Sequence, residues 1–254
     1  MEYEFIKYPK IPHLDASLNI LDNPVDVFEK IDGGNTQIRN INGRVIPGVR
    51  SKFLGSEKLM RMPWFKGFQN FVMSNYSFYN LPENLVMYGE WSAQHTLEYF
   101  PEFVNKFFVL DVFDTEKGKF LPYQIGKESL EKAGIGNVLY LEQLIAEKKT
   151  SLDELKKLVT KSPYRDGSME GVVVKDYQST PQKFAKLWTS IINAEKGRLS
   201  TDDVRRAINS YLDENDGDID PNKLVDEIIS EYESLGYRLD PRNLKDLVTS
   251  NLKK

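Results

Sequence analysis

The sequence predicts an α+β protein: a large, sheet-rich domain of antiparallel strands with flanking helices, followed by a small all-α domain. Three observations predict this class. Short apolar runs broken by turn residues extend from about residue 28 to residue 186. Asn42-Gly43 lies between two alternating segments, a pattern typical of a hairpin with a type I′ turn. After about residue 193, apolar residues recur every three or four positions, as in amphipathic helices.

Further elements of the sheet-rich domain follow from local patterns. Strands are expected over Leu85 to Tyr88, Phe107 to Val112, Gly171 to Lys175 and Phe184 to Trp188. Helices are expected over Glu57 to Phe71 and Ser151 to Thr160. The second of these helices has a capping box, because Ser151 and Glu154 have the required spacing.

The C-terminal part of the chain has the pattern of three short helices. They are expected over residues 200–215, 221–236 and 241–252, with proline or acidic starts and Gly236 as a stop. We therefore place a large, sheet-rich domain at residues 1–192 and a small helical domain at residues 193–254.

Composition excludes several kinds of chemistry. The 254 residues include no cysteine, which excludes disulfides, thiolate metal sites and cysteine nucleophiles. Only His13 and His95 are histidines, so catalysis built on a histidine base is not expected. Lysines, carboxylates and a carboxylate-bound divalent metal remain.

The charge is unevenly distributed along the chain. The formal net charge is -4, but residues 201–254 hold 13 acidic and 8 basic side chains, so residues 1–200 are slightly basic. A basic stretch lies within residues 50–66, interrupted only by Glu57; its members are Arg50, Lys52, Lys58, Arg61 and Lys66. This stretch is either a solvated helix face or a surface that binds phosphate groups. The aromatic residues Trp64, Phe65 and Phe68, which lie next to Arg61 and Lys66, have helical spacing. We expect them in the core rather than against nucleic acid.

Membrane association is not expected. No run of eighteen apolar residues occurs, and the N-terminal residues lack the apolar stretch and cleavage site of a secretory signal. We expect a cytoplasmic protein, in the host-cell cytoplasm if the protein is viral.

The segment from Glu29 to Asn35, EKIDGGN, is unusual for a purely structural strand. In a strand, Lys30 and Asp32 share one face, and the two glycines that follow permit a close approach of the backbone. A lysine that attacks a nucleotide phosphate needs a fixed backbone and an adjacent turn that admits the nucleotide. This segment alone is compatible with an ordinary turn as well.

The string K-x-D-G-x-N resembles the first motif of the covalent nucleotidyltransferases, which include DNA ligases, RNA ligases and mRNA capping enzymes. Five further segments resemble the later motifs of that family in the family's order. They are Arg50-Ser51-Lys52, Tyr88-Gly89-Glu90-Trp91, Phe107-Phe108-Val109-Leu110-Asp111, Glu170-Gly171-Val172-Val173-Val174-Lys175 and Phe184-Ala185-Lys186-Leu187-Trp188. The six matches extend over residues 28–188, nearly two-thirds of the chain.

The resemblance implies a role for each matching residue. Lys30 would be the nucleophile that forms lysyl-AMP, with Glu90, Glu170 and Lys186 as its catalytic partners. The residues expected to bind ATP or AMP are Glu29, Ile31, Asp32, Asn35, Arg50, Glu90, Phe108, Leu110, Lys175 and Lys186. The residues expected to contact nucleic acid are Arg50, Lys52 and Asn35.

Physical chemistry adds two expectations about this site. A lysine of ordinary pKa, about 10.4, is almost fully protonated at neutral pH, so Lys30 needs a lowered pKa, which Mg²⁺ and the cations Lys175 or Lys186 would provide. Asp32, Glu90 and Glu170 should gather at the pocket. Such oxygen ligands suit Mg²⁺, with Mn²⁺ as an alternative; Glu170 and Glu90 would hold the ion, largely through water and phosphate.

Three departures from the family pattern leave alternatives open. The residue before the motif aspartate is usually aromatic and stacks on adenine, but here it is Leu110, so either Leu110 or Phe108 makes that contact. The last motif often has two lysines one residue apart, and Phe184 occupies the first position, which Lys183 would have to replace. Asp32 is typical of DNA ligases, whereas the RNA ligases often have histidine there.

The C-terminal residues favour one member of the family. DNA ligases and capping enzymes have a β-rich OB-fold module after the last motif, but only about 60 residues of helical pattern follow Trp188. This arrangement resembles the RNA ligase 2 type. The resemblance implies an ATP-dependent ligase that joins RNA 3′-OH and 5′-phosphate ends through lysyl-AMP and RNA-adenylate, and we expect it to be a monomer. An ATP-dependent DNA ligase or a capping-type guanylyltransferase is the alternative.

Overall fold

The computed structural model describes residues 4–14, 19–50, 52–54, 63–93, 97–159, 161–188, 208, 220–234, 244–245 and 248–249. The chain divides into two compact units, Met1–Leu187 and Trp188–Lys254. In the parts of the chain that are described, no helix is long and apolar enough to span a bilayer.

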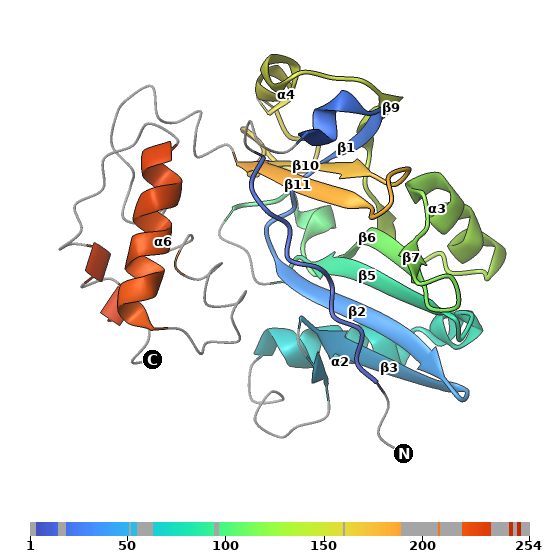
Figure 1. The fold of residues 1–254 in the computed structure, drawn as a ribbon. Coiled ribbons are helices and arrows are strands. Elements are labelled where there is room, and N and C mark those ends of the chain that lie inside the picture. The colour runs from blue at the N-terminus through green and yellow to red at the C-terminus, as the bar shows by residue number, and fades with distance from the viewer. Residues whose placement is uncertain are drawn as a thin grey trace. The chain divides into compact units, whose positions relative to one another are not determined.

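Two antiparallel sheets form the first unit (Figure 1). The smaller sheet has the strand order β11-β10-β1-β9. Its strands are β1 (Val25–Glu29), β9 (Gln143–Lys148), β10 (Gly171–Asp176) and β11 (Lys183–Trp188). The larger sheet has the order β4-β3-β2-β5-β6-β7, with β8 parallel beside β6. Its strands are β2 (Gly34–Ile41), β3 (Arg44–Val49), β4 (Lys52–Phe53), β5 (Leu85–Trp91), β6 (Phe107–Asp114), β7 (Lys119–Phe120) and β8 (Leu139–Tyr140). The predicted class, α+β with antiparallel sheets, is confirmed.

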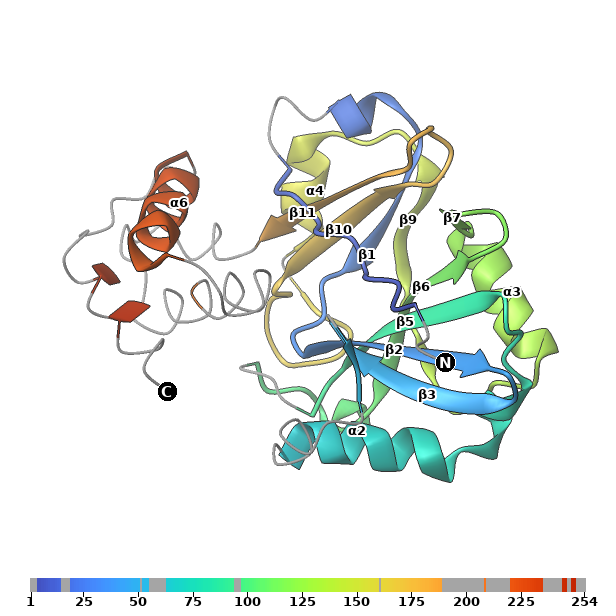
Figure 2. The same cartoon turned by 60° about the horizontal axis from the view of Figure 1, so that its bottom comes forward.

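Helices flank these sheets, and Figure 2 shows α2 lying along one face of the larger sheet. The α-helices of this unit are α2 (Pro63–Ser74), α3 (Tyr123–Lys132) and α4 (Leu152–Leu158); the 3-10 helices are η1 (Asn19–Asp22), η2 (Tyr76–Asn80) and η3 (Pro101–Phe103). Phe68 of α2 is fully buried and packs against Trp91 and Phe107 of the sheet. The expectation that Phe68 is a core residue is therefore confirmed.

The β2–β3 hairpin has the predicted turn. Ile41 pairs with Arg44, which leaves Asn42 and Gly43 as the two turn residues. Both have positive φ, 52° for Asn42 and 71° for Gly43, as a type I′ turn requires.

A bulge interrupts the pairing of β5 and β6. Tyr88 pairs with Asp111 and Gly89 pairs with Val109, so Leu110 is an extra residue on β6. The bulge lies beside the expected nucleotide pocket.

An aromatic core fills the space between the two sheets. Phe28 of β1 and Phe108 of β6 are fully buried in it, together with Ile31, Tyr99, Tyr123, Leu141, Tyr164 and Tyr177. Phe28 packs on Tyr123 with ring centroids 4.5 Å apart. This core holds the sheets at a fixed separation.

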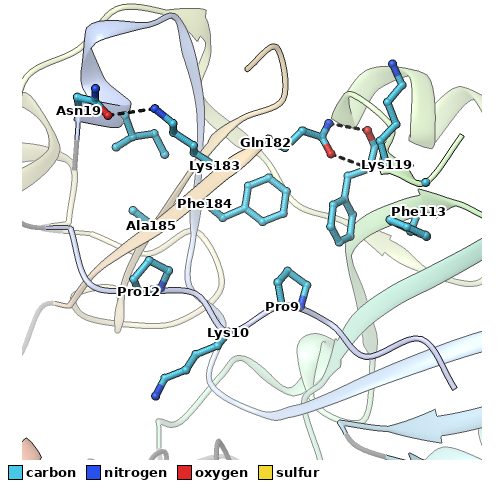
Figure 3. Close-up of a pocket in the computed structure, with 13 residues that line it drawn as sticks. Pro9, Lys10, Pro12, Asn19, Phe113, Lys119, Gln182, Lys183, Phe184 and Ala185 are labelled. Carbon is cyan, nitrogen blue, oxygen red and sulfur yellow. Dashed lines mark hydrogen bonds between the residues drawn. The ribbon is translucent and has the colours of Figure 1, made fainter. Parts of the chain in front are cut away.

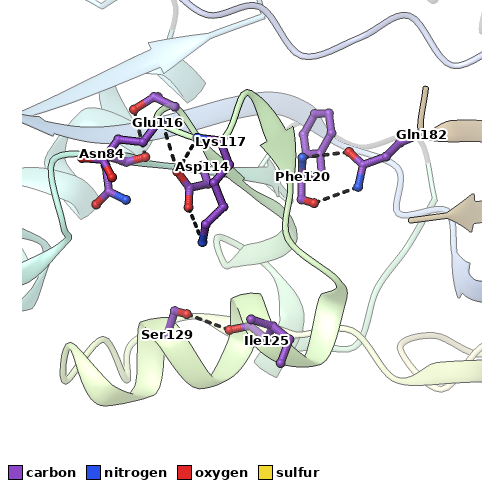
Figure 4. Close-up of polar contacts among 9 residues, drawn as sticks. Asn84, Asp114, Glu116, Lys117, Phe120, Ile125, Ser129 and Gln182 are labelled. Carbon is purple, nitrogen blue, oxygen red and sulfur yellow. Dashed lines mark hydrogen bonds and ion pairs between the residues drawn. The ribbon is translucent and has the colours of Figure 1, made fainter. Parts of the chain in front are cut away.

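A glutamine also joins the two sheets (Figure 4). The Gln182 side chain donates to the Phe120 carbonyl and accepts from the Phe120 N–H, each at 2.8 Å. It thus replaces a strand partner for β7. The adjacent β6–β7 turn is held by Asp114, which accepts from the backbone N–H groups of Glu116 and Lys117 and pairs with the Lys117 ammonium.

The N-terminal segment, residues 4–14, crosses from one sheet to the other (Figure 1). The Ile6 carbonyl accepts from Tyr88 of the larger sheet at 2.7 Å. At the other end, Leu14 N–H donates to the Lys186 carbonyl at 2.8 Å, and Lys186 N–H donates to the Pro12 carbonyl at 2.9 Å. The segment therefore fixes the backbone of Lys186.

Both helices predicted in the first unit are present, but their bounds differ from the predicted ones. Helix α2 begins at Pro63, and the residues at 55–62, where the helix was expected to begin, lie outside the described part. Helix α4 has the predicted capping box of Ser151 and Glu154. Helix α3 and strand β9 were not predicted.

The second unit contains one described helix of several turns, α6 (Pro221–Ser234). It corresponds to the second of the three helices expected in the C-terminal domain. The other two, at residues 200–215 and 241–252, fall almost entirely on residues outside the description. The all-helical C-terminal domain therefore stays a prediction.

Candidate active site

Lys30 lies where the chain leaves one sheet for the other. Strand β1 ends at Glu29 and β2 begins at Gly34, so residues 30–33 connect the two sheets. The expectation that Lys30 and Asp32 lie on a strand is wrong, because β1 ends at Glu29 and the chain turns between the sheets here. The β1–β10 ladder continues past the strand with a backbone bond from Lys30 N–H to the Gly171 carbonyl at 2.9 Å.

The Lys30 ammonium is paired with Glu170. Its Nζ lies 2.8 Å from both Glu170 oxygens. The Lys30 side chain is 24% exposed and that of Glu170 is 9% exposed, so the pair is largely buried and Lys30 is its more accessible member. Glu170 directly precedes β10, which pairs with β1, and this register brings the two motif residues together.

The pKa of Lys30 in the ligand-free protein is set by burial and by the carboxylates around the ammonium. Burial disfavours the ammonium, but the Glu170 carboxylate, with help from Glu90 and Asp32, outweighs burial and raises the pKa of Lys30. The expected lowering of this pKa concerns a site that holds Mg²⁺ and stays a prediction; in the ligand-free protein, carboxylates around the amine raise the pKa. A neutral nucleophile therefore requires that the Glu170 pairing be loosened or that the proton pass to a carboxylate.

Glu90 is the second carboxylate of the site. It lies on β5, directly opposite Asn35 of β2. Burial raises the pKa of Glu90 to about 8, and the charges of Lys30 and Arg50 oppose this shift only in part. The backbone of Arg50 is held nearby, because the Arg50 backbone N–H donates to the Asn35 carbonyl at 3.1 Å.

The Arg50 side chain has capacity to bind an anion. It is half-buried, and its Nε has no hydrogen-bond partner within the described residues. A phosphate oxygen would satisfy this donor. Lys52, the other basic residue of the second motif, is exposed on the short strand β4.

The three carboxylates act on one another. Burial raises the pKa of Glu170, and the charge of Asp32 adds to the effect. Such mutual repulsion fits a site that accepts a cation among oxygen ligands. Among the described residues, however, no three metal-ligating side chains lie close enough to form a preassembled metal site. Binding of Mg²⁺ by Glu90 and Glu170, largely through water and phosphate, therefore stays a prediction.

Asp32 and Gly33 are held against neighbouring segments. The Asp32 carboxylate accepts from Leu97 N–H at 2.9 Å. A Cβ on Gly33 would lie 2.6 Å from the Trp91 carbonyl oxygen, so only glycine permits this passage beside β5. The close approach predicted from the glycines is thus made to the protein's own strand.

Lys186 lies close enough to Glu170 for their charges to interact. It is buried, and its charge is one of those that lower the pKa of Glu170. Lys183 was considered as a second lysine, but its ammonium donates to the Asn19 side chain at 3.0 Å (Figure 3). Phe184 itself contributes an aromatic ring beside Phe120 and Tyr177.

Lys175 is placed in a buried cluster that we call the Asp111 cluster. The Lys175 ammonium donates to Asp111 and to the Leu110 carbonyl, both at 2.7 Å. Tyr177 donates to the same carboxylate at 2.6 Å, and Tyr8 of the N-terminal segment also donates to it. The structure does not place Lys175 among the charges that shift the pKa of Lys30.

Leu110 and Phe108 were the alternatives for the adenine contact. The Phe108 ring is fully buried, with Phe103 and Tyr164 on it. Leu110 is half-buried, sits on the bulge and packs against the aromatic core. Glu29 and Ile31, which flank Lys30, are both buried.

A separate cavity of about 480 Å³ lies between the N-terminal segment, β11 and the β6–β7 turn (Figure 3). Phenylalanine rings and prolines dominate its wall, which includes Pro9, Pro12, Phe113, Phe120 and Phe184. None of Lys30, Glu90, Glu170 and Lys186 lines it. The cavity is therefore distinct from the site of the predicted chemistry.

Two residues that the sequence did not single out contact the neighbours of Lys30. The Tyr99 hydroxyl accepts from Asp32 N–H at 2.7 Å. The Ser162 hydroxyl donates to the buried Glu29 carboxylate at 2.7 Å. Both residues lie in loops far from Lys30 in sequence, and no local motif marks them.

Comparison with known proteins gives three results. The family model described as RNA ligase matches residues 23–189. A search of curated proteins found no match. Solved structures of similar fold include an archaeal ATP-dependent RNA ligase, with a TM-score of 0.56 and 18% identity, covering 80% of this chain and 52% of that one.

A second similar structure is the Naegleria gruberi RNA ligase with PPi. It has a TM-score of 0.51 and 17% identity, with 76% of this chain and 59% of that chain covered. A mutant of the same ligase with ATP and Mn gives a TM-score of 0.50 at 15% identity. The chain thus spans little more than half the length of these ligases, and the likeness concerns the fold. Because the family model covers about two-thirds of the sequence, including all six motifs, the chain belongs to the RNA ligase family.

Proposed function

We propose that this protein is an ATP-dependent RNA ligase that joins 3′-OH and 5′-phosphate ends, with Lys30 as the nucleophile. The observation that carries the proposal is the pairing of Lys30 Nζ with both Glu170 oxygens at 2.8 Å, where the chain passes from one sheet to the other. Family membership and solved relatives described with ATP and Mn support it.

In the first step, the Lys30 ammonium passes a proton to Glu170. The resulting neutral amine then attacks the α-phosphorus of ATP. A nitrogen–phosphorus bond forms as the bond to pyrophosphate breaks. Lys186 and Arg50 neutralise the phosphate charge, and Leu110 contacts the adenine. A divalent cation held by Glu90 and Glu170 would neutralise further phosphate charge and compete with Lys30 for Glu170.

The next two steps transfer AMP and then expel it. An oxygen of the RNA 5′-phosphate attacks the lysyl-AMP phosphorus, which frees the Lys30 amine and leaves AMP on the RNA. The 3′-OH of the other end then attacks the 5′-phosphate, forms the phosphodiester bond and releases AMP. Positioning and charge stabilisation dominate each transfer.

Incubation with labelled ATP or GTP, followed by denaturing electrophoresis, tests this proposal. We expect a labelled protein with ATP only, and no label in Lys30→Ala or Lys30→Arg. Lys30→Arg retains a cation beside Glu170, so its thermal stability should match the wild type and exclude misfolding as the cause. Labelling by GTP would instead indicate a capping-type guanylyltransferase, and no label with either nucleotide would refute lysyl-nucleotide chemistry.

Matched nicked substrates separate RNA joining from DNA joining. RNA and DNA duplexes of one sequence, each with a 5′-phosphate and a 3′-OH at the nick, are incubated with ATP and Mg²⁺. We expect sealing of the RNA nick. Sealing of the DNA nick alone would support the DNA ligase alternative, for which Asp32 is typical.

A further inference from the structure

The segment that carries Lys30 lies just beyond the end of strand β1. Residues 30–33 connect the two sheets, and the Asp32 N–H donates to a side-chain hydroxyl, that of Tyr99. A buried N–H without an acceptor costs about 1–3 kcal/mol and leaves a backbone free to shift. Contacts from outside the sheets therefore contribute to fixing the position of the nucleophile.

On one side of Lys30, a loop from the larger sheet holds Asp32. The Tyr99 hydroxyl accepts from Asp32 N–H at 2.7 Å, and Leu97 N–H donates to the Asp32 carboxylate at 2.9 Å. Tyr99 is buried, so these contacts are shielded from water. Backbone and side chain of Asp32 are thus both fixed.

On the other side of Lys30, the loop before Glu170 holds Glu29. The buried Ser162 hydroxyl donates to Glu29 at 2.7 Å and accepts from Tyr164 N–H at 3.0 Å. Ser162 N–H also donates to the Gly167 carbonyl at 2.9 Å, which closes this loop on itself. The loop leads directly into Glu170, the partner of Lys30.

The two loops are joined to each other. Phe100, next to Tyr99, donates its N–H to the Tyr164 carbonyl at 3.0 Å. The Phe103 ring contacts the Tyr164 ring edge-on, with centroids 5.2 Å apart. A closed circuit of contacts, which we call the collar, therefore surrounds the nucleophile; its members are Glu29, Asp32, Leu97, Tyr99, Phe100, Ser162 and Tyr164.

We propose that Tyr99 and Ser162 are positioning residues for the attack of Lys30 on ATP. This inference rests on the proposed function, because it concerns the lysyl-AMP step. Neither residue contributes to proton transfer or phosphate binding in that proposal. A small displacement of a nucleophile costs rate rather than substrate affinity, since the near-attack geometry is lost while the binding contacts remain.

The collar acts on the first step alone. RNA that already carries AMP on its 5′-phosphate is sealed without attack by Lys30, so its sealing does not require a positioned amine. A collar variant should be slow in forming lysyl-AMP and normal in sealing this substrate. A variant with a general folding defect would be slow in both.

Single-turnover kinetics on the full chain test the proposal. Tyr99→Phe retains the ring but removes the acceptor for Asp32 N–H, and we expect lysyl-AMP formation at saturating ATP to slow at least ~10-fold with KM within ~2-fold. Ser162→Ala should slow the same step, and Ser162→Thr, which retains the hydroxyl, should restore it. Tyr76→Phe, at a position 81% exposed, and Ser129→Ala, on helix α3, are matched controls expected to react as the wild type.

The double variant Tyr99→Phe/Ser162→Ala adds a second readout. Because either substitution opens the same circuit, the combined slowing should be smaller than the product of the two. If the wild type forms lysyl-AMP and Tyr99→Phe forms it at the wild-type rate, the collar is refuted. If Tyr99→Phe slows both steps equally, the role is structural and the proposal is also refuted. A wild type that forms no lysyl-AMP refutes the proposed function instead.

Discussion

At the scale of single residues, the site is governed by buried carboxyl groups around one lysine. The charges of Glu170, Glu90 and Asp32 outweigh burial and raise the pKa of Lys30, whereas burial is the main cause that raises the pKa values of Glu90 and Glu170. The ligand-free site is therefore a resting state, in which the nucleophile is protonated and paired. Arrival of ATP changes this balance, because its phosphates bring charge and counter-ions.

Glu90 gives a stability prediction whose sign can be derived. The pKa of Glu90 is about 8 in the folded protein, against about 4.3 in an unfolded chain. Between these values the folded state binds the extra proton, so stability falls as pH rises from about 4.5 to 8. Glu90→Gln removes this dependence. Urea unfolding at pH 5.5, 7 and 8.5, without nucleotide or metal, should show a flatter profile for the variant; identical profiles would contradict the assignment.

The Asp111 cluster gives a second prediction at this scale. Lys175 is only 2% exposed, and its partner is Asp111. Asp111→Asn leaves a buried ammonium without its counter-ion, and we expect a loss of about 3–5 kcal/mol in the free energy of unfolding. Adding Lys175→Met should restore part of that loss, because the stranded charge is removed. A double variant as unstable as the sum of both singles would show that the two residues do not interact.

At the scale of elements, the link between β7 and β11 decides how firmly the two sheets are joined. Gln182→Glu replaces the amide that donates to the carbonyls of Phe120 and Tyr177 with a second acceptor. We expect a loss of about 1–3 kcal/mol in unfolding free energy at pH 7, with recovery at low pH where the new carboxyl is protonated. Gln124→Glu, an exposed change on α3, is the control and should be neutral.

The elements also show which features the sequence was able to predict. Strands with contiguous apolar residues, the Asn42-Gly43 turn and the Ser151 cap were predicted, because their signals lie within a few residues. Helix α3 was missed because its sequence, YQIGKESLEK, has few apolar residues and an internal glycine. The break between β1 and β2 was missed because it depends on two sheets, not on local propensity.

The residues of the site also fall into those that local motifs predict and those that depend on long-range contacts. The motif residues Lys30, Glu90 and Glu170 were predicted from sequence, and the structure brings their charges together. Tyr99 and Ser162 were not predicted, because each is an isolated polar residue in a loop whose partner is 67 or 133 positions away. Burial of Lys175 against Asp111 likewise depends on a long-range contact.

At the scale of the whole molecule, the motif residues all lie in the first of the two compact units, apart from Trp188 at its boundary. We expect a chain ending at residue 192 to form lysyl-AMP with ATP at a rate within ~3-fold of the full chain, because positioning of Lys30 is contained in that unit. Labelling of both chains under one set of conditions measures this. Loss of labelling in the shorter chain, with its fold intact by circular dichroism, would show that the second unit completes the nucleotide site.

The central claim, that Lys30 becomes covalently attached to AMP, is tested most directly by mass spectrometry. The full chain is incubated with ATP and Mg²⁺, denatured, digested and mapped. The account predicts one peptide heavier by an AMP group, with the modification on Lys30. An AMP group on any other lysine, or none on a folded protein that binds ATP, would contradict it.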